Sequence, residues 1–188
     1  MPRYYDLMDD RKSITRWHLR SPVDEKGQEV DPWQFDKGQW LESPGTVRFP
    51  VKPPGQALEF TLASFAIPVV HARVVRLFER LGIQNEAQFI PVQVEGQSEP
   101  WFILNALSII RCIDDARCAQ VQYWKPEDNR PDKVGQYRAV HGMRIDPTKP
   151  GTAHIFRPWG WRVALVVSES LKDAMEKEGI TGTRFVEA

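Results

Sequence analysis

The sequence predicts an α+β fold, with a mainly antiparallel sheet, two principal helices and an irregular N-terminal layer rich in short strands and turns. Two helical patterns stand among about seven or eight segments of strand-like composition. Most of these segments are joined by short turns, and strands do not alternate with helices, which argues against a doubly wound parallel sheet. A chain of 188 residues is long enough to bury a core without disulfide bonds.

The first 55 residues differ in composition from the rest. They are interrupted by prolines and glycines, which leave only short β-like pieces at Arg3–Leu7, Ile14–Leu19 and Thr46–Phe49. Four aromatic residues are scattered among them: Trp17, Trp33, Phe35 and Trp40. We therefore predict an irregular subdomain over residues 1–55, packed through its aromatic residues on an α+β core domain over residues 56–188.

A first helix is predicted after Pro68, a residue that is tolerated in the first helical turn. Apolar residues then recur at helical spacing, and Gly82 can end the helix in a left-handed conformation. These apolar positions are Val70, Val74, Leu77, Phe78 and Leu81.

A second helix is predicted near the C-terminus. Ser168 can cap it, and Leu171, Ala174 and Met175 fall on one face. Gly179 should end this helix, and Thr183–Val186 is predicted as a final strand.

The strands lie before and between these helices. Gln88–Val94 and Trp101–Ile113 flank a hairpin turn at residues 95–98, and the second run is either one long strand or two strands broken near Asn105. The other predicted strands are Leu58–Ala63, Ala119–Trp124, Tyr137–Ile145, His154–Phe156 and Val163–Val167.

Composition narrows the function classes. Lys plus Arg and Asp plus Glu both number 25, so the basic excess typical of nucleic-acid binders is missing. The N-terminal residues contain no apolar run of signal-peptide length, and no stretch has the ~20 apolar residues that span a bilayer. We therefore expect a cytoplasmic protein that contacts neither membrane nor nucleic acid directly.

Catalytic motifs are not evident. The chain contains no phosphate-binding glycine loop, no G-x-S-x-G turn and no H-E-x-x-H pair. We predict no catalytic residue, no metal and no cofactor, and we expect Cys112 to be a small buried residue. An enzymatic alternative remains open, in which Cys112 acts as a nucleophile or His141 and His154 meet an acid such as Asp146.

The candidate binding residues are acidic or aromatic. Two loops carry acids, which are either solvated turn residues or an acidic surface for a basic partner. Trp159 and Trp161 precede an apolar strand and are either core residues or exposed anchors. We take as candidate binding residues Asp114, Asp115, Trp124, Glu127, Asp128, Asp132 and Trp159.

The C-terminal third carries a recognisable pattern. It consists of residues 154–157 (HIFR), residues 164–172 (ALVVSESLK) and residues 179–185 (GITGTRF), with weaker matches at Tyr4-Tyr5, residues 36–38, Pro91-Val92, Leu104-Asn105 and residues 112–114. Through this pattern the chain resembles the immunity protein 11 family of bacterial polymorphic-toxin systems.

The resemblance implies a protein that protects its producer by binding one partner toxin, and it supplies no catalytic residues. Because the chain shows no export signal, the toxin is expected to act in the cytosol, and a nuclease is the class that we expect. Two alternatives are a small hydrolase with a Cys or His–Asp site and a secretion-system adaptor. A deep pocket that gathers His141, His154 and an acid would favour the hydrolase.

Overall fold

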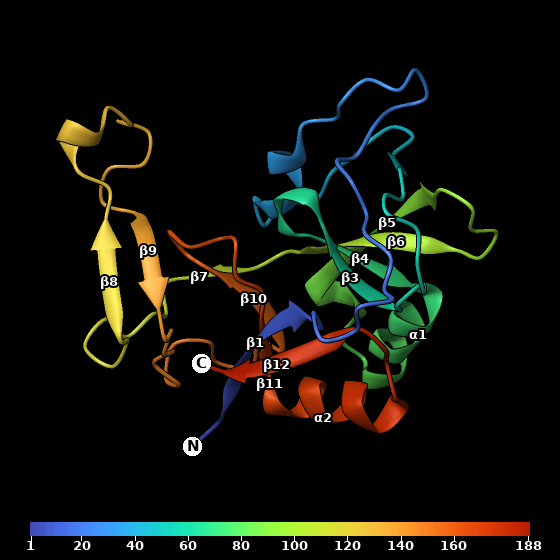
Figure 1. Ribbon diagram of the computed structural model, residues 1–188. Coiled ribbons are helices and arrows are strands. Elements are labelled where there is room, and N and C mark those ends of the chain that lie inside the picture. Colours follow the sequence, from blue (N-terminus) through green and yellow to red (C-terminus); the bar gives the residue numbers. More distant parts are fainter.

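The computed structural model describes all 188 residues and confirms the α+β fold. The first sheet has five strands in the order β12-β1-β11-β10-β7, with antiparallel pairing except between β10 and β7 (Figure 1). Their bounds are β12 Thr183–Glu187, β1 Tyr4–Asp9, β11 Val166–Ser168, β10 Ile155–Pro158 and β7 Ile109–Ile110. The strand nearest the N-terminus thus lies beside the strand nearest the C-terminus.

The second sheet also has five strands, in the order β2-β5-β6-β4-β3. The bounds are β2 Arg48–Phe49, β5 Ala87–Val94, β6 Trp101–Ala106, β4 Ile67–His71 and β3 Phe60–Ala63. Strands β5 and β6 form the antiparallel hairpin that the sequence predicts around residues 95–98. The long apolar run from residue 101 is broken into β6 and β7, which settles the alternative that the sequence left open.

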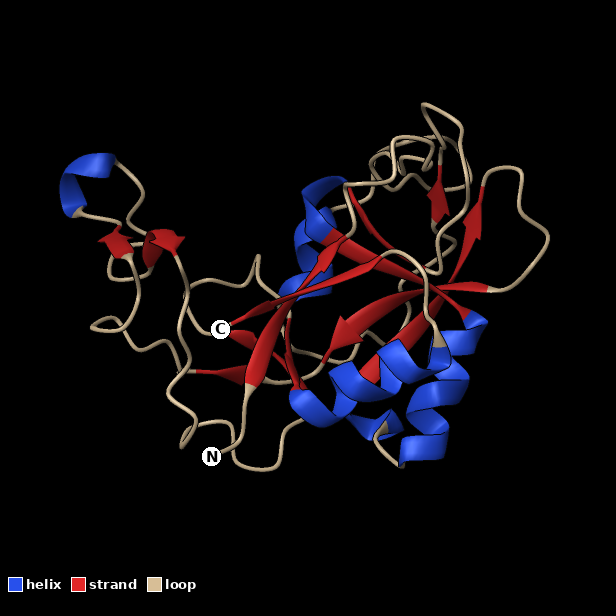
Figure 2. Ribbon diagram, turned by 60° about the horizontal axis from the view of Figure 1, so that its bottom comes forward, coloured by secondary structure: helices blue, strands red, loops and turns tan.

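Helices α1 (Ala72–Leu81) and α2 (Glu169–Glu178) pack on the same side of the molecule (Figure 2). Their apolar faces enter a core cluster that both sheets share: Val74, Leu77 and Phe78 from α1, and Leu171 and Met175 from α2. Ser168 caps α2 and Gly179 ends it in a left-handed conformation, as the sequence predicts.

The central strands of both sheets are buried on both faces. In β6, Leu104 joins the core shared with the helices, whereas its neighbour Ile103 joins a second cluster beneath the N-terminal layer. In β11, Val167 faces the helices and Val166 faces a third cluster. Successive strand residues point to opposite faces, so two buried faces produce continuous apolar runs instead of alternating ones.

The start of α1 differs from the prediction. Pro68 and Val70 lie in β4, which pairs with both β3 and β6, and the helix begins only at Ala72. His71 caps it, because its ring Nδ1 accepts a hydrogen bond from the Arg73 amide at 3.3 Å. The helical spacing of apolar residues could not separate the buried strand β4 from the helix that directly follows it.

Several other strand predictions were too long, among them the following three. Residues Ile14–Leu19 form only isolated bridges, at Arg16 and at Leu19. Val163 lies in an exposed turn before β11. The strand predicted at Tyr137–Ile145 ends at His141, although Ile145 still bridges to Ile113.

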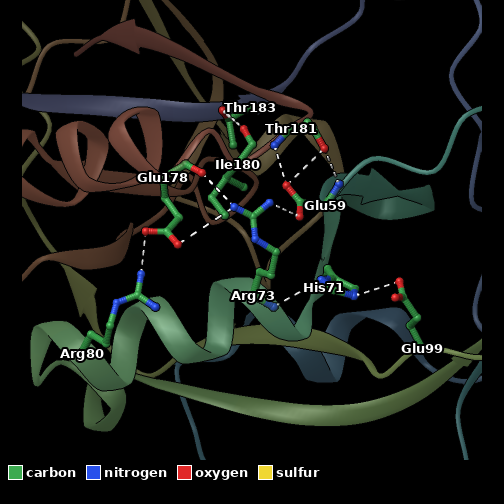
Figure 3. A network of polar contacts seen from close by, with 9 residues as sticks. All are labelled: Glu59, His71, Arg73, Arg80, Glu99, Glu178, Ile180, Thr181 and Thr183. Carbon is green, nitrogen blue, oxygen red and sulfur yellow. Dashed lines mark hydrogen bonds and ion pairs between the residues drawn. The ribbon is translucent and has the colours of Figure 1, made fainter.

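A polar network joins the two helices (Figure 3). The guanidinium of Arg73 in α1 contacts the Glu59 carboxylate at 2.6 Å and donates to the backbone carbonyl of Glu178, at the end of α2, at 2.8 Å. Glu59 also accepts a hydrogen bond from the backbone amide of Thr181 at 3.0 Å, and Arg80 pairs with the Glu178 carboxylate at 2.6 Å. These contacts fix α1 against the chain that leaves α2.

The irregular N-terminal segment covers one face of the second sheet. Trp17 is buried there, 5.0 Å from the ring of Trp101, and its indole N–H donates to the Thr61 hydroxyl at 2.9 Å. Phe35 and Phe49 are buried in the same cluster. The division into domains at residue 55 remains a prediction.

Candidate functional site

A β-hairpin projects from the side of the first sheet (Figures 1 and 2). It consists of β8 (Gln120–Tyr123) and β9 (Tyr137–His141), joined by a loop that contains the short helix η4 (Pro126–Asp128). We call residues 114–141 the projection. It carries six of the seven predicted binding residues, and the seventh, Trp159, lies in the turn after β10.

Asp115 organises the base of the projection. The ring of Tyr123 stacks on that of Tyr137 with 4.9 Å between centroids, and both hydroxyls donate to the Asp115 carboxylate, Tyr137 at 2.6 Å. The hydrogen bond to Asp115 raises the pKa of Tyr123, and burial together with that carboxylate raises the pKa of Tyr137. Asp115 therefore holds two strands together through its carboxylate.

The other predicted acids are mostly paired within the projection. Asp128 pairs with Arg138 at 2.9 Å, Asp132 with Arg130 at 3.0 Å, and Asp114 lies 4.0 Å from Arg117. Among these acids Glu127 alone is exposed and without an ion pair. Arginine side chains of the projection therefore neutralise most of the negative charge of these acids.

Basic side chains surround Trp124. Arg138, Lys133 and Arg130 place their charged groups 5.3, 5.4 and 6.0 Å from the centroid of its ring. A cation at this range is attracted by the ring's quadrupole, so the indole gathers three positive charges on one side of the projection.

Between the projection and the body of the protein lies a groove of about 770 Å³. On the body side its aromatic and aliphatic residues come from short helices η1 (Pro32–Asp36) and η2 (Ser64–Ala66) and from the β10–β11 turn. Its apolar residues include Trp33, Phe65, Trp124, Trp161 and Val163. Its charged residues are Arg130, Lys133, Arg138, Arg157 and Arg162, against Asp36 and Asp132.

Arg157 is the most deeply buried charge lining the groove. Only 2% of the residue is exposed; its Nη1 donates to the Arg162 carbonyl at 2.5 Å, while Nε has no hydrogen-bond partner. Burial lowers the pKa of Arg157 to about 10, although the nearby Asp36 opposes the shift, so the guanidinium stays charged at neutral pH. The Asp36 Oδ1 atom lies 3.6 Å from Arg162 and likewise lacks a hydrogen bond.

The backbone at η2 adopts an uncommon conformation. Phe65 and Ala66 have φ angles of 62° and 55°, in the left-handed region that non-glycine residues rarely occupy. This conformation holds the Phe65 ring half-exposed at the groove, in edge-to-face contact with Trp33 at 5.5 Å. Strained backbone of this kind is concentrated at functional sites.

The model of the Immunity protein family (Imm11) matches residues 4–188. The chain belongs to this family. No curated protein matches the sequence. The Imm11 match includes both sheets, the projection and every residue that lines the groove.

In this Imm11 chain the aromatic candidates occupy two environments. Trp124 lines the groove, whereas the Trp159 ring stacks under the Arg111 guanidinium at 3.7 Å. Trp159 and Trp161 both lie in the turn after β10 and are half-buried, so each is intermediate between the core residue and the exposed anchor that the sequence left open.

Sequence reasoning missed several residues of the groove. Trp33 was expected to pack on the core, but 54% of it is exposed. Phe65, Val163 and Arg157 were not candidates at all. The one available signal was the number of tryptophans near turns; the left-handed backbone at Phe65 and the burial of Arg157 arise from tertiary packing.

The residues of the enzymatic alternative do not form a site. Burial raises the pKa of Cys112 to about 12, which keeps the thiol protonated and poorly nucleophilic. His154 binds the Glu86 carboxylate through Nδ1 at 2.7 Å, while His141 lies exposed in β9. No cluster of His, Cys, Asp and Glu side chains is arranged to hold a metal ion, and no helix is long and apolar enough to cross a bilayer.

Proposed function

We propose that this chain protects the cell that makes it by binding and neutralising one partner toxin, without catalysing a reaction. The match to the Imm11 family over residues 4–188 carries this proposal. The protonated state of Cys112 and the separate environments of His141 and His154 agree with a role in binding.

We further propose that the toxin is a nuclease that acts in the cytosol, and that the immunity protein meets it there. This proposal extends the immunity role of the family to one class of toxin. The projection and the groove beside it are the proposed binding surface, because exposed aromatic and basic residues are typical of interface anchors.

Co-expression tests the function directly. Cells that produce the toxin encoded by the neighbouring gene should survive when they also produce this protein, with no added metal or nucleotide. Survival should persist in Cys112→Ala and in His154→Ala, because neither side chain has a catalytic task in this proposal and neither lies in the projection or lines the groove. Loss of protection by either folded variant would favour an enzyme, and failure of the wild-type chain to protect would refute the immunity role.

A further inference from the structure

We propose that the groove between the projection and the body receives an acidic segment of the toxin, with carboxylates and apolar side chains on different sides of that segment. This inference rests on the proposed immunity function and names the chemistry that its binding surface selects. It differs from a general acidic surface for a basic partner.

The charges in the groove favour an anionic occupant. Five Arg and Lys side chains line it against two Asp side chains, although the chain as a whole has no net charge. Lys133 has no ion-pair partner, while Arg130 and Arg138 are held in place by single acids of the projection. Carboxylates that enter the groove would meet cations that are already positioned, which limits the entropy lost on binding.

Two residues that line the groove have incomplete hydrogen bonding. Arg157 is almost completely buried, yet its Nε–H lacks an acceptor, and Asp36 Oδ1 lacks a donor. Buried polar groups are nearly always satisfied, and leaving one unpaired costs free energy. Both atoms are enclosed by the protein, so these unpaired groups show that charge is held beside the groove at a cost in stability, and an occupant of the groove would not contact them directly.

The aromatic and aliphatic residues show that the occupant is also partly apolar. Trp33, Phe65 and Val163 are 54%, 52% and 53% exposed, and all three line the groove from the body side. The projection supplies Lys133 and Arg138 to the same groove. An extended peptide directs successive side chains to opposite sides. A peptide with alternating acidic and apolar residues would therefore contact the basic residues of the projection and the apolar residues of the body at the same time.

A nucleic acid could also use cations and aromatic rings, through its phosphates and bases. The family match indicates a protein partner, and the half-exposed Val163 and Phe65 offer aliphatic and aromatic contact to its side chains. We therefore assign the groove to a protein segment and treat nucleic-acid binding as an outcome that would contradict the assignment.

The test measures binding of the purified toxin from the neighbouring gene to the full-length protein. The Lys133→Glu/Arg138→Glu variant should weaken affinity by about tenfold or more, and raised salt should weaken the wild-type complex more than the variant complex. A matched control, Lys12→Glu/Lys26→Glu, makes the same change in charge at exposed positions away from the groove and should bind within about twofold of wild type. Lys133→Arg should retain wild-type affinity.

A competition experiment and the outcomes of the binding measurement distinguish an error in the groove assignment from an error in the immunity function. A peptide of alternating Glu and Leu should compete with the toxin, whereas its Lys–Leu counterpart and a single-stranded oligonucleotide should not. Unchanged toxin binding by the folded Lys133→Glu/Arg138→Glu variant would overturn the groove assignment and leave the immunity function standing. Competition by the oligonucleotide but not by the Glu–Leu peptide would also overturn the groove assignment. A wild-type protein that does not bind the toxin would overturn both proposals.

Discussion

At the scale of single residues, several charged side chains in and around the first sheet are buried, which lowers the stability of the folded protein. Asp6 lies in β1, is largely buried, and has a pKa raised to about 6. Burial is the main cause, and a hydrogen bond from the Leu165 backbone and the charges of Arg184 and Arg157 oppose it only in part. Together with Arg157 and Asp36, Asp6 adds a third charged group in an environment that disfavours charge. The charged groups at these positions destabilise the fold, as residues near functional surfaces commonly do.

Asp6→Asn is expected to stabilise the protein at neutral pH. The unfolded carboxyl loses its proton near pH 4 and the folded one only near pH 6, so the wild-type stability falls as pH rises through this interval. The amide cannot ionise, and the variant should gain about 1–2 kcal/mol at pH 7.5 and almost nothing at pH 4. Urea unfolding at both pH values measures this, with the exposed Asp173→Asn as a control that should show no such difference.

At the scale of elements, the helices depend on both their apolar faces and the network around Arg73. Burial alone would raise the pKa of Glu59, but the Thr181 amide and the Arg73 guanidinium outweigh it, and the pKa is lowered. A lowered pKa means that ionised Glu59 contributes stability above about pH 4.5 and that this contribution is lost as pH falls through the folded value.

Glu59→Gln should therefore lower the free energy of unfolding by about 1–3 kcal/mol at pH 7, because a charged hydrogen-bonded pair is replaced by neutral contacts. The difference between variant and wild type should shrink toward zero near pH 3. Chemical denaturation at the two pH values checks the result. Glu176→Gln, which breaks only the exposed pair with Lys172, should change stability by less than about 1 kcal/mol.

Met175→Asp tests the buried face of α2. Only 1% of Met175 is exposed, within the cluster that joins both sheets to the helices, so an unpaired carboxylate there should cost about 3–5 kcal/mol. A fall in melting temperature large enough to reduce the soluble yield is the expected outcome. A melting curve that overlays the wild-type curve would show that this face of α2 does not stabilise the fold.

The elements with local signals were predicted well. Helix α2 has a capping serine, an apolar face and a terminal glycine within twelve residues of sequence, and all three act as expected. Strand β4 and the start of α1 were predicted less well, because the pairing of Val69 with Ile103 depends on a strand more than thirty residues away. For the candidate site, the projection could be anticipated from its two strands and polar loop. The groove could not, because residues from η1, η2 and the β10–β11 turn meet there only through the tertiary fold.

At the scale of the whole molecule, the body and the projection have different tasks. The central strands of the two sheets are buried on both faces by three apolar clusters, and α1 and α2 pack on the cluster that both sheets share. The projection adds a small two-stranded sheet whose residues are mostly exposed or half-buried. The groove therefore lies between a closely packed body and a projection that is less buried.

The acids of the projection provide the last prediction. If they formed an acidic surface for a basic toxin, neutralising Glu127, Asp128 and Asp132 together would slow association. In the structure Asp128 and Asp132 instead hold Arg138 and Arg130, so neutralising them releases positive charge beside the groove. We therefore expect the Glu127→Gln/Asp128→Asn/Asp132→Asn variant to associate with the toxin about two- to fivefold faster at low salt, because long-range attraction acts on the association rate.

The advantage should disappear as salt shortens the screening length to about 8 Å at physiological ionic strength and to less above it. The same stopped-flow or surface-based measurement compares the dissociation rates, with Trp33→Ala as the reference for a short-range contact. Truncating that half-exposed ring should speed dissociation and leave association nearly unchanged, since apolar contacts act only after encounter. Slower association of the triple variant at low salt would instead identify the acids themselves as the surface that attracts the toxin, and the groove would lose its electrostatic role.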